Sequence, residues 1–365
     1  MSRDPYRNLA AHLDALPNGF PSTADGRELR ILAKLFTPEE AGLAAQLTLN
    51  LETADDIAAR TGRDATGLHD QLKSLARRGL IDAGRTDGGL GFKSIPYVVG
   101  FYENQLHTMD PELAHLAEDY FRGGFGSMLE VEPQFHRVVP AHETVHTSVE
   151  VRPFESVADI VYSMRSWGVQ DCVCRVQKRL IGQVCKHPVD VCLVMDPHPN
   201  VFDDSPDFRA LTRDEAMATL RRASEAGLVH TVTNTVEGTS YICNCCTCSC
   251  GLLRGMADLG LANVVASSPF VNLVQDELCT GCEDCVPACQ FTALSMDESL
   301  VRVDRDRCVG CGVCVLTCAA EALVLVRRPA DEVKPVPQTR RDWQQQRLAA
   351  RGRAGEPQAT TAHPV

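Results

Sequence analysis

The 365-residue sequence lacks the features of secreted, membrane-spanning and nucleotide-binding proteins. No apolar signal-peptide core follows residues 1–7, and no uninterrupted apolar stretch reaches the length of a membrane span. Neither G-x-G-x-x-G after a strand nor G-x4-G-K-[ST] occurs, so a flavin or nicotinamide would have to be on a partner. The net charge of -12 argues against a general nucleic-acid or anionic-membrane binder. We therefore expect a cytoplasmic protein.

Cysteine, in contrast, is abundant, with seventeen residues in the chain. Because cytosolic thiols are kept reduced, these cysteines are not expected to form a disulfide scaffold. They indicate metal ligands or redox centres. The 44% hydrophobic content supports a packed core, and 365 residues predict two or three domains.

Eight of the cysteines form two copies of the spacing C-x2-C-x2-C-x3-C, offset by 29 residues. A four-iron, four-sulfur cube needs four converging thiolates, and the x2 steps let one tight loop supply three of them. Zinc sites separate their cysteine pairs by longer spacers, so this spacing favours iron–sulfur clusters. The two copies are Cys279, Cys282, Cys285, Cys289 and Cys308, Cys311, Cys314, Cys318.

Together with short alternating strands around the polar turn at 297–299, these runs resemble a bacterial-type dicluster ferredoxin at 266–328. The resemblance implies two 4Fe-4S clusters that serve electron transfer. It also implies that the fourth cysteine of each run ligates the other cluster. One departure is that Gln290 and Ala319 stand where such ferredoxins usually have proline. The implied ligand sets are Cys279, Cys282, Cys285 with Cys318, and Cys308, Cys311, Cys314 with Cys289.

The other nine cysteines lie in a predicted mixed α/β domain at 148–265, in two groups. We hypothesise that the first group supplies four ligands and the second three or four, for one or two further iron–sulfur clusters. Zinc, thiol redox chemistry without a metal, and packing as small hydrophobes are the alternatives. The groups are Cys172, Cys174, Cys185, Cys192 and Cys243, Cys245, Cys246, Cys248, Cys250.

Three further observations concern the residues around these nine cysteines. The vicinal pair Cys245 and Cys246 rarely gives two ligands to one ion, so at least one thiol is expected to be free, redox-active or bound to a second centre. Arg175 and Arg254 are placed to stabilise thiolates or an anionic cluster. His187 is a possible ligand beside Cys185, although a histidine before proline is more often a turn residue.

The N-terminal region predicts three helices and a hairpin, and resembles a winged helix-turn-helix of the MarR-like sort at 28–98. Residues 1–100 hold twelve Lys/Arg and thirteen Asp/Glu, so neutralisation of phosphates would be weak. The charge balance favours a protein-docking or lid element over a DNA-binding one, and fold analogy alone does not decide between them.

The fold class predicted for the whole chain is α+β multidomain. Residues 1–27 are expected to form an N-terminal extension, and residues 99–147 a helical linker. Residues 329–365 are rich in Pro, Arg, Gln and Ala, which predicts a disordered tail apart from a short helix near 343–350.

Over its whole length, the order of winged helix, Cys-x-Cys-Arg, Cys-Asn-Cys-Cys-x-Cys-x-Cys-Gly and dicluster ferredoxin resembles uncharacterised 4Fe-4S binding proteins of anaerobic bacteria and archaea. The expected function is electron transfer between a redox partner, a flavoprotein or another iron–sulfur oxidoreductase, and a centre in the middle domain. Alternatives are a redox-sensing transcriptional regulator and an oxidoreductase with an open iron site. An electron carrier is favoured over a stand-alone enzyme.

Overall fold

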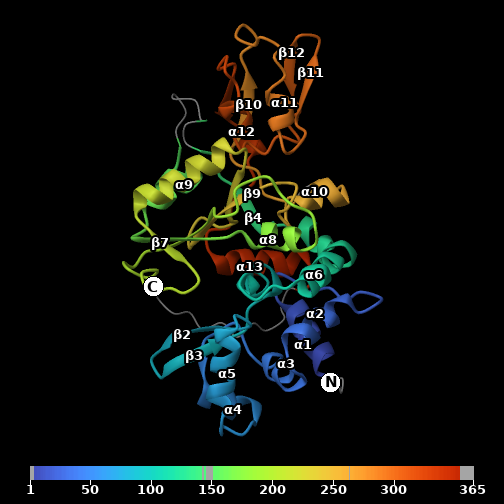
Figure 1. Cartoon of the computed structure of the whole chain (residues 1–365), viewed down its shortest axis with the longest axis vertical. Helices are drawn as coiled ribbons and strands as arrows, with labels where there is room; N and C mark the ends of the chain where they lie inside the picture. Colours follow the sequence, from blue (N-terminus) through green and yellow to red (C-terminus); the bar gives the residue numbers. More distant parts are fainter. Residues whose placement is uncertain (1–3, 142–143, 145–150, 263, 354–365) are drawn as a thin grey trace. The chain divides into compact units, whose positions relative to one another are not determined.

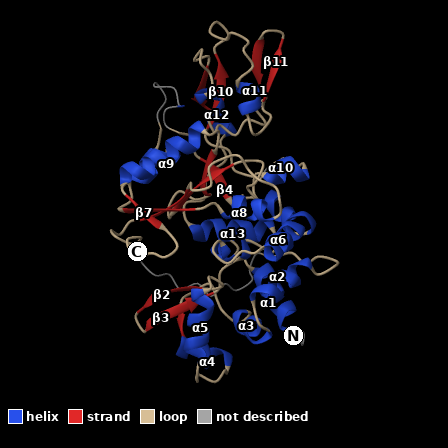
Figure 2. Ribbon diagram, in the orientation of Figure 1, coloured by secondary structure: helices blue, strands red, loops and turns tan. Residues whose placement is uncertain are grey.

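The computed structural model describes residues 4–141, 144, 151–262 and 264–353. The chain divides into two compact units, Met1–Val131 with Gln345–Val365, and Glu132–Gln344. Helices and strands occur in both units, in agreement with the predicted α+β class (Figures 1 and 2). In the described residues, no helix combines the length and apolar character needed to cross a membrane.

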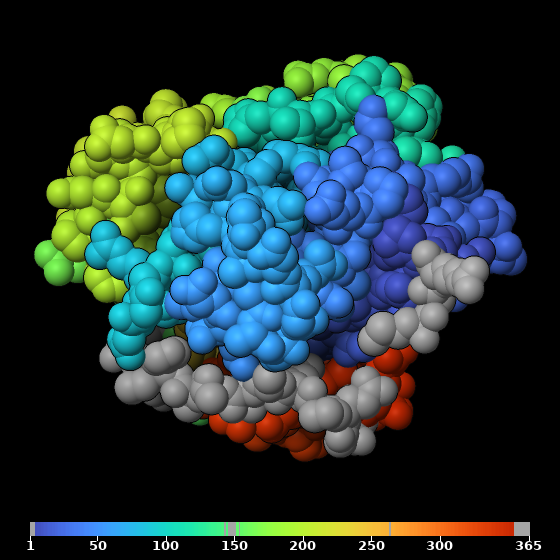
Figure 3. Space-filling model, turned by 90° about the horizontal axis from the view of Figure 1, so that it is seen from below, coloured from blue at the N-terminus to red at the C-terminus, as the bar shows by residue number. Residues whose placement is uncertain are grey.

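The described residues of the first unit up to Val131 contain six α-helices and a small antiparallel sheet of order β1-β3-β2, and Figure 3 shows part of the surface in blue. Helix α3 begins with a capping box, in which the side chains of Thr37 and Glu40 each accept the other residue's backbone N–H. Thr53 and Asp56 do the same at α4. The elements are α1 (Pro5–Ala15), α2 (Arg27–Leu35), α3 (Pro38–Ala44), β1 (Glu52–Thr53), α4 (Ala54–Thr61), α5 (Leu68–Arg77), β2 (Asp82–Thr86), β3 (Gly89–Lys93) and α6 (Pro111–Gly123).

Two segments of this unit differ from the sequence-based domain limits. The expected extension 1–27 contains α1, whose Leu9 and Leu13 are buried, and α1 contacts α2 and α3. In the expected linker 99–147, α6 contacts α2 and buries Leu113 and Tyr120. Both segments contribute apolar side chains to the core of the first unit, so the expected limits at 28 and 98 do not coincide with the limits of a compact body.

The expected disordered tail is wrong for the described residues up to 353, because α13 (Arg340–Ala350) is held by specific contacts. Arg347 is fully buried, and its guanidinium donates to the carbonyls of Pro17 (3.0 Å), Met128 (2.6 Å) and Val131 (2.5 Å). In the second unit, the Trp343 indole donates to Gln134 O at 2.9 Å. The sequence predicts a short helix near 343–350, but its composition does not indicate that distant backbone acceptors hold this helix in place.

The second unit is built on a six-stranded antiparallel sheet of order β4-β8-β9-β6-β5-β7. The sheet begins at β4, inside the segment expected as a linker, and the expected boundary at 148 lies outside the described residues. Its elements are β4 (His136–Val138), α7 (Val157–Tyr162), β5 (Ser166–Gln170), α8 (Val173–Leu180), β6 (Cys192–Asp196), β7 (Arg209–Leu211), α9 (Arg213–Glu225), β8 (Val229–Thr233), β9 (Tyr241–Cys245) and α10 (Arg254–Leu259).

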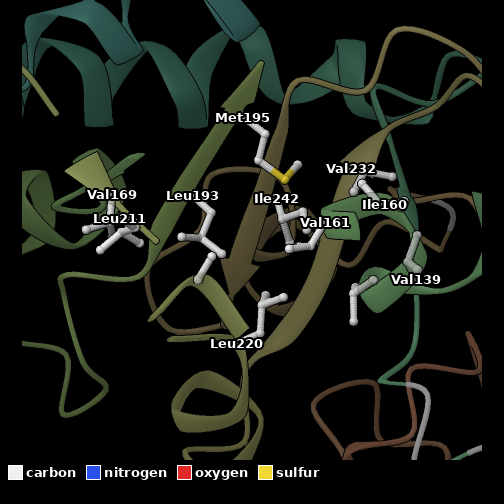
Figure 4. Packing of buried hydrophobic residues seen from close by; sticks show 12 residues of the cluster. Val139, Ile160, Val161, Val169, Leu193, Met195, Leu211, Leu220, Val232 and Ile242 are labelled. Carbon is white, nitrogen blue, oxygen red and sulfur yellow. The ribbon is translucent and has the colours of Figure 1, made fainter. Parts of the chain in front are cut away.

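One face of this sheet carries the hydrophobic core of the unit (Figure 4). Leu193 and Met195 of β6 and Ile242 of β9 pack with Val161 of α7 and Leu220 of α9. Because side chains alternate along a strand, the residues between these apolar positions project to the opposite face. Those residues include cysteines, and this alternation brings thiols together on the face away from the core.

The C-terminal part of this unit is a pair of related two-stranded sheets, β10 with β13 and β11 with β12. The 29-residue offset relates β10 to β12 and β11 to β13, so the duplication in the sequence is also a duplication of strands. Two short helices begin within the cysteine runs. The elements are β10 (Phe270–Val274), α11 (Cys285–Ala288), β11 (Leu294–Asp297), β12 (Leu300–Val303), α12 (Val313–Leu316) and β13 (Leu323–Arg327).

Candidate metal centres

The first C-terminal thiol group, called site I, lines a small cavity. Its members are Cys279, Cys282, Cys285 and Cys318. Burial raises the pKa of Cys285, and the thiolates of the other three members act in the same direction. Cys318 comes from the second cysteine run, whereas the other three thiols come from the first. This mixed origin is the ligand arrangement that the ferredoxin resemblance implies.

The second group, called site II, consists of Cys308, Cys311, Cys314 and Cys289. Burial raises the pKa of Cys314 well above its usual value, and Cys311, Cys289 and Cys308 raise it further. Four clustered thiolates, of which Cys314 is buried, repel one another unless cations neutralise them, and iron ions would supply that charge. The donor set at both sites therefore fits a cysteine-ligated iron–sulfur cluster.

Hydrogen bonds to the sulfurs are partly repeated in the two sites. The backbone N–H of Ala293 donates to Cys289 Sγ, and that of Ala322 donates to Cys318 Sγ, both at 3.3 Å. Site II has an additional donor, because the buried Asn272 side-chain amide donates to Cys314 Sγ at 2.9 Å. The residue at the equivalent position, 29 residues later, is Val301, which lines the cavity of site I.

We expect Asn272→Val to lower the reduction potential of a cluster at site II. An N–H donor stabilises the more negative reduced state, so its loss should shift the potential by on the order of 50 mV. Redox titration followed by EPR measures the shift. The reciprocal change Val301→Asn, which adds a donor near site I, is the matched control and should raise the other potential. Equal potentials before and after Asn272→Val would contradict this role for the amide.

The nine cysteines of the middle domain divide into two groups that differ from the two groups in the sequence. Cys192 of β6 and Cys243 and Cys245 of β9 occupy strand positions that alternate with the core residues Leu193 and Ile242. Three cysteines outside these strands complete the group: Cys172 and Cys174 lie at the start of α8, and Cys250 lies in the loop after β9.

These six side chains form a closed ring, called the six-cysteine ring. The pKa of each thiol is shifted by interactions with two others of the group, which link them in the order Cys172, Cys174, Cys250, Cys245, Cys243, Cys192 and back to Cys172. The Cys250 and Cys245 sulfurs are 3.4 Å apart.

The other group, called the Cys185 site, contains Cys185, His187, Cys246 and Cys248, whose ligand atoms all lie within 4.8 Å of one another. Cys185 Sγ is 3.2 Å from His187 Nδ1, 3.3 Å from Cys248 Sγ and 3.8 Å from Cys246 Sγ. Zinc–sulfur bonds of about 2.3 Å in a tetrahedron place sulfurs about 3.8 Å apart. A four-iron cube holds its thiolates at separate corners, farther apart. The Cys185 site therefore fits one tetrahedral ion.

Electrostatics in the Cys185 site favour metal ligation. A hydrogen bond from Cys248 is the main cause that lowers the pKa of Cys246, to about 3. The pKa of His187 is raised chiefly by its hydrogen bond with Cys246. When one thiol of the site ionises, its negative charge stabilises protons on the neighbouring groups. A bound metal cation would take the place of those protons.

Arg175 is the cation associated with both thiol groups. It is buried, and its Nη2 donates to Asn244 O at 2.8 Å and to Cys246 Sγ at 3.5 Å. Burial acts to lower its pKa, but the charges of Cys172, Cys246 and Cys245 outweigh burial, and the pKa is raised. Its Nε and Nη1 are buried without a hydrogen-bond partner. Arg254 instead pairs with Asp258, with Nη2 and Oδ2 2.6 Å apart.

These positions revise the sequence-based ligand sets. Cys185 was grouped with Cys172, Cys174 and Cys192, but its sulfur lies with Cys246 and Cys248. The vicinal Cys245 and Cys246 point to different groups, as the argument against one shared ion anticipated. His187 was favoured as a turn residue, yet its ring belongs to the Cys185 site. The Cys-x-His spacing was the available signal for this histidine.

The paired strands and crossed thiol sets of the C-terminal segment define a ferredoxin-type domain. Residues 278–322 match the family described as a 4Fe-4S dicluster domain. The match covers both cysteine runs and supports an iron–sulfur electron-transfer role. No curated protein and no solved structure gives a significant match to the chain.

Proposed function

We propose that this protein carries electrons between a redox partner protein and a metal–thiolate centre in its middle domain. Sites I and II would each hold a 4Fe-4S cluster, which supplies one-electron transfer when bound. Each cluster would have three ligands from one run and the fourth from the other. The observation that carries the proposal is a side-chain bridge between a cysteine loop of site II and the cysteine loop of the middle domain.

Gln290 forms this bridge. It follows the site II ligand Cys289 directly, at a position where dicluster ferredoxins usually have proline. Its Oε1 accepts the backbone N–H of Thr247 at 2.7 Å, and its Nε2 donates to Gly227 O. Thr247 lies between Cys246 and Cys248 of the Cys185 site. The bridge therefore joins ligand loops of two centres, which is the arrangement that internal electron transfer needs.

Further contacts within the second unit hold the two domains together. The Arg327 guanidinium of β13 pairs with the buried Glu155 carboxylate through contacts of 2.5 and 3.2 Å. Ala266 and β4 also exchange backbone hydrogen bonds, Val138 N to Ala266 O and Ala266 N to His136 O, each at 2.9 Å. A bidentate pair with a buried carboxylate restricts relative movement, so these contacts support a fixed relay over transient docking.

The relay is tested by Gln290→Ala, which introduces the residue found at the equivalent Ala319. The change removes two hydrogen bonds that are together worth about 1–3 kcal/mol. A free-energy change of this size alters the population of the bridged arrangement about tenfold, so reduction of the middle-domain centre should slow about tenfold. The measurement is anaerobic stopped-flow reduction by a one-electron donor, with rapid-freeze EPR to separate the ferredoxin signals from the middle-domain signal.

Ala319→Gln is the matched control, because Ala319 is exposed and lies in the other half of the duplication. It should leave the internal rate unchanged. If intact protein shows reduction of the two ferredoxin clusters and of nothing in residues 172–250, the relay proposal is wrong. An unchanged rate in Gln290→Ala would remove the bridge from the path.

For the N-terminal domain, we propose a winged-helix-like module that docks a protein partner. Its element order, α3, β1, α4, α5, β2 and β3, is typical of that fold, and α5 corresponds to the recognition helix. Just after α5, Arg78 Nη1 pairs with Glu40 at 2.6 Å. Because this arginine is already neutralised by an internal carboxylate, the pairing favours protein docking over DNA binding.

A further inference from the structure

The six-cysteine ring has more thiols than a single metal ion accepts. A tetrahedral zinc or iron ion takes four thiolates, whereas here six side chains form one continuous circuit. The circuit closes through Cys245, Cys243 and Cys192. Two separate ions would divide the thiols into two sets, but each thiol has a neighbour on both sides. Shared or bridged metal ions would use all six linked thiols, which favours a polynuclear centre over isolated ions.

The protein around the ring is rigid and preorganised. Cys192, Cys243 and Cys245 are fixed by the pairing of β6 and β9, in which Leu193 faces Ile242. Cys245 Sγ is also 3.4 Å from Thr231 Oγ1, which is itself 3.0 Å from His136 Nδ1. Cys245 and Cys250 are buried, and the remaining members are half-buried. A scaffold of this kind supports ligands in fixed directions, as metal clusters require.

Arg175 indicates the chemical nature of the occupant. Its charge interacts with Cys172 and Cys245 of the ring, while two of its buried nitrogens, Nε and Nη1, have no protein acceptor. Buried N–H groups are rarely left without an acceptor. A metal cluster in the ring would supply sulfur acceptors for these nitrogens, and in an iron–sulfur cluster these include inorganic sulfide.

We propose that the six-cysteine ring binds a polynuclear iron–sulfur cluster, separate from the single-ion Cys185 site. The inference rests on the proposed relay and deepens it, since the ring becomes the redox centre that receives or supplies the electrons. Gln290 contacts Thr247, which lies between Cys246 and Cys248 of the Cys185 site, and Cys246 is adjacent in the chain to Cys245 of the ring.

Metal and sulfide analysis of the full chain, isolated anaerobically, tests this assignment. Cys243→Ala removes a ring thiol and should lower iron by at least two ions, with a matching loss of acid-labile sulfide. Cys248→Ala is the matched variant in the Cys185 site and should lower the metal content by about one ion, with sulfide unchanged. Both variants should retain the signals of the two ferredoxin clusters.

The proposal is overturned if Cys243→Ala loses zinc in place of iron, loses no more than one ion, or loses the same metal as Cys248→Ala. If circular dichroism shows that Cys243→Ala does not fold, Thr231→Val provides a second test. This variant keeps all six thiols and removes only the hydroxyl beside Cys245. It should leave the iron content unchanged and shift the EPR or Mössbauer signature of a middle-domain cluster. An unaltered signature would then overturn the proposal. These readouts count metal, so they are independent of the transfer rate that tests the relay.

Discussion

Cys318→Ala combined with Cys282→Ala is expected to cost the protein about four irons, the same loss as either substitution alone. Both thiols line site I, so the second substitution removes a ligand from a cluster that is already lost. Cys318→Ala combined with Cys311→Ala should cost about eight irons, because Cys311 belongs to site II with Cys289 and Cys308. Iron and sulfide analysis of the anaerobic protein measures both losses.

The same pair of double variants excludes the alternative ligand arrangement. If each run held its own cluster, Cys318→Ala with Cys311→Ala would lose about four irons, and Cys318→Ala with Cys282→Ala about eight. EPR of the single variants identifies which signal survives. This test is robust to partial cluster loss during isolation, because it compares the two double variants with each other.

Gly310→Ala is expected to disrupt the ligand loop of site II. Gly310 has φ of +67°, a conformation that costs an L-residue about 1–2 kcal/mol. A methyl group would also collide with Phe270 O and Ser268 Oγ, and would approach Phe270 C to 2.8 Å. The backbone carbonyl belongs to β10 and has little freedom to move, so we expect a total destabilisation of about 3–5 kcal/mol. The variant should therefore lose the site II cluster and unfold at lower denaturant.

Gly260→Ala is the matched control for this prediction. Gly260 has a similar φ of +69°, but a methyl group there would meet nothing within 4 Å. It isolates the cost of the left-handed backbone, about 1 kcal/mol, and should retain all metal. Anaerobic urea unfolding followed by circular dichroism compares the two. Equal destabilisation would show that the collision at Gly310 is relieved by movement of the loop.

The structure also distinguishes the two halves of the duplicated domain. Ala293 and Ala322 make the same backbone hydrogen bond to a cysteine sulfur in each half. Asn272 and Gln290 have no equivalent, because Val301 and Ala319 stand at the repeated positions. Both additional contacts involve site II ligand loops. Under the proposed relay, site II would exchange electrons inside the chain, and site I, whose Cys282 is exposed, would face the external partner.

Features that depend on neighbouring residues in the chain were predictable. The spacing of the two cysteine runs led to the dicluster domain that the family match supports. Capping boxes at Thr37, Thr53 and Thr212, which are readable from local spacing, begin helices. Each of these features depends on residues only three or four positions apart. Their spacing can therefore be read directly from the sequence. A short helix near 343–350 was predictable, but the burial of Arg347 within it was not, because its hydrogen-bond acceptors lie hundreds of residues away.

The sequence by itself determined the spacing of the eight C-terminal cysteines, which predicts the dicluster domain, and it indicated metal or redox chemistry for the other nine. Only the tertiary structure decided how the nine upstream thiols divide, because β6 and β9 bring Cys192 beside Cys243 across a gap of fifty residues. The same is true of Cys185 with Cys246, and of Gln290 with Thr247. Strand pairing and alternation, which act between distant segments, set these contacts.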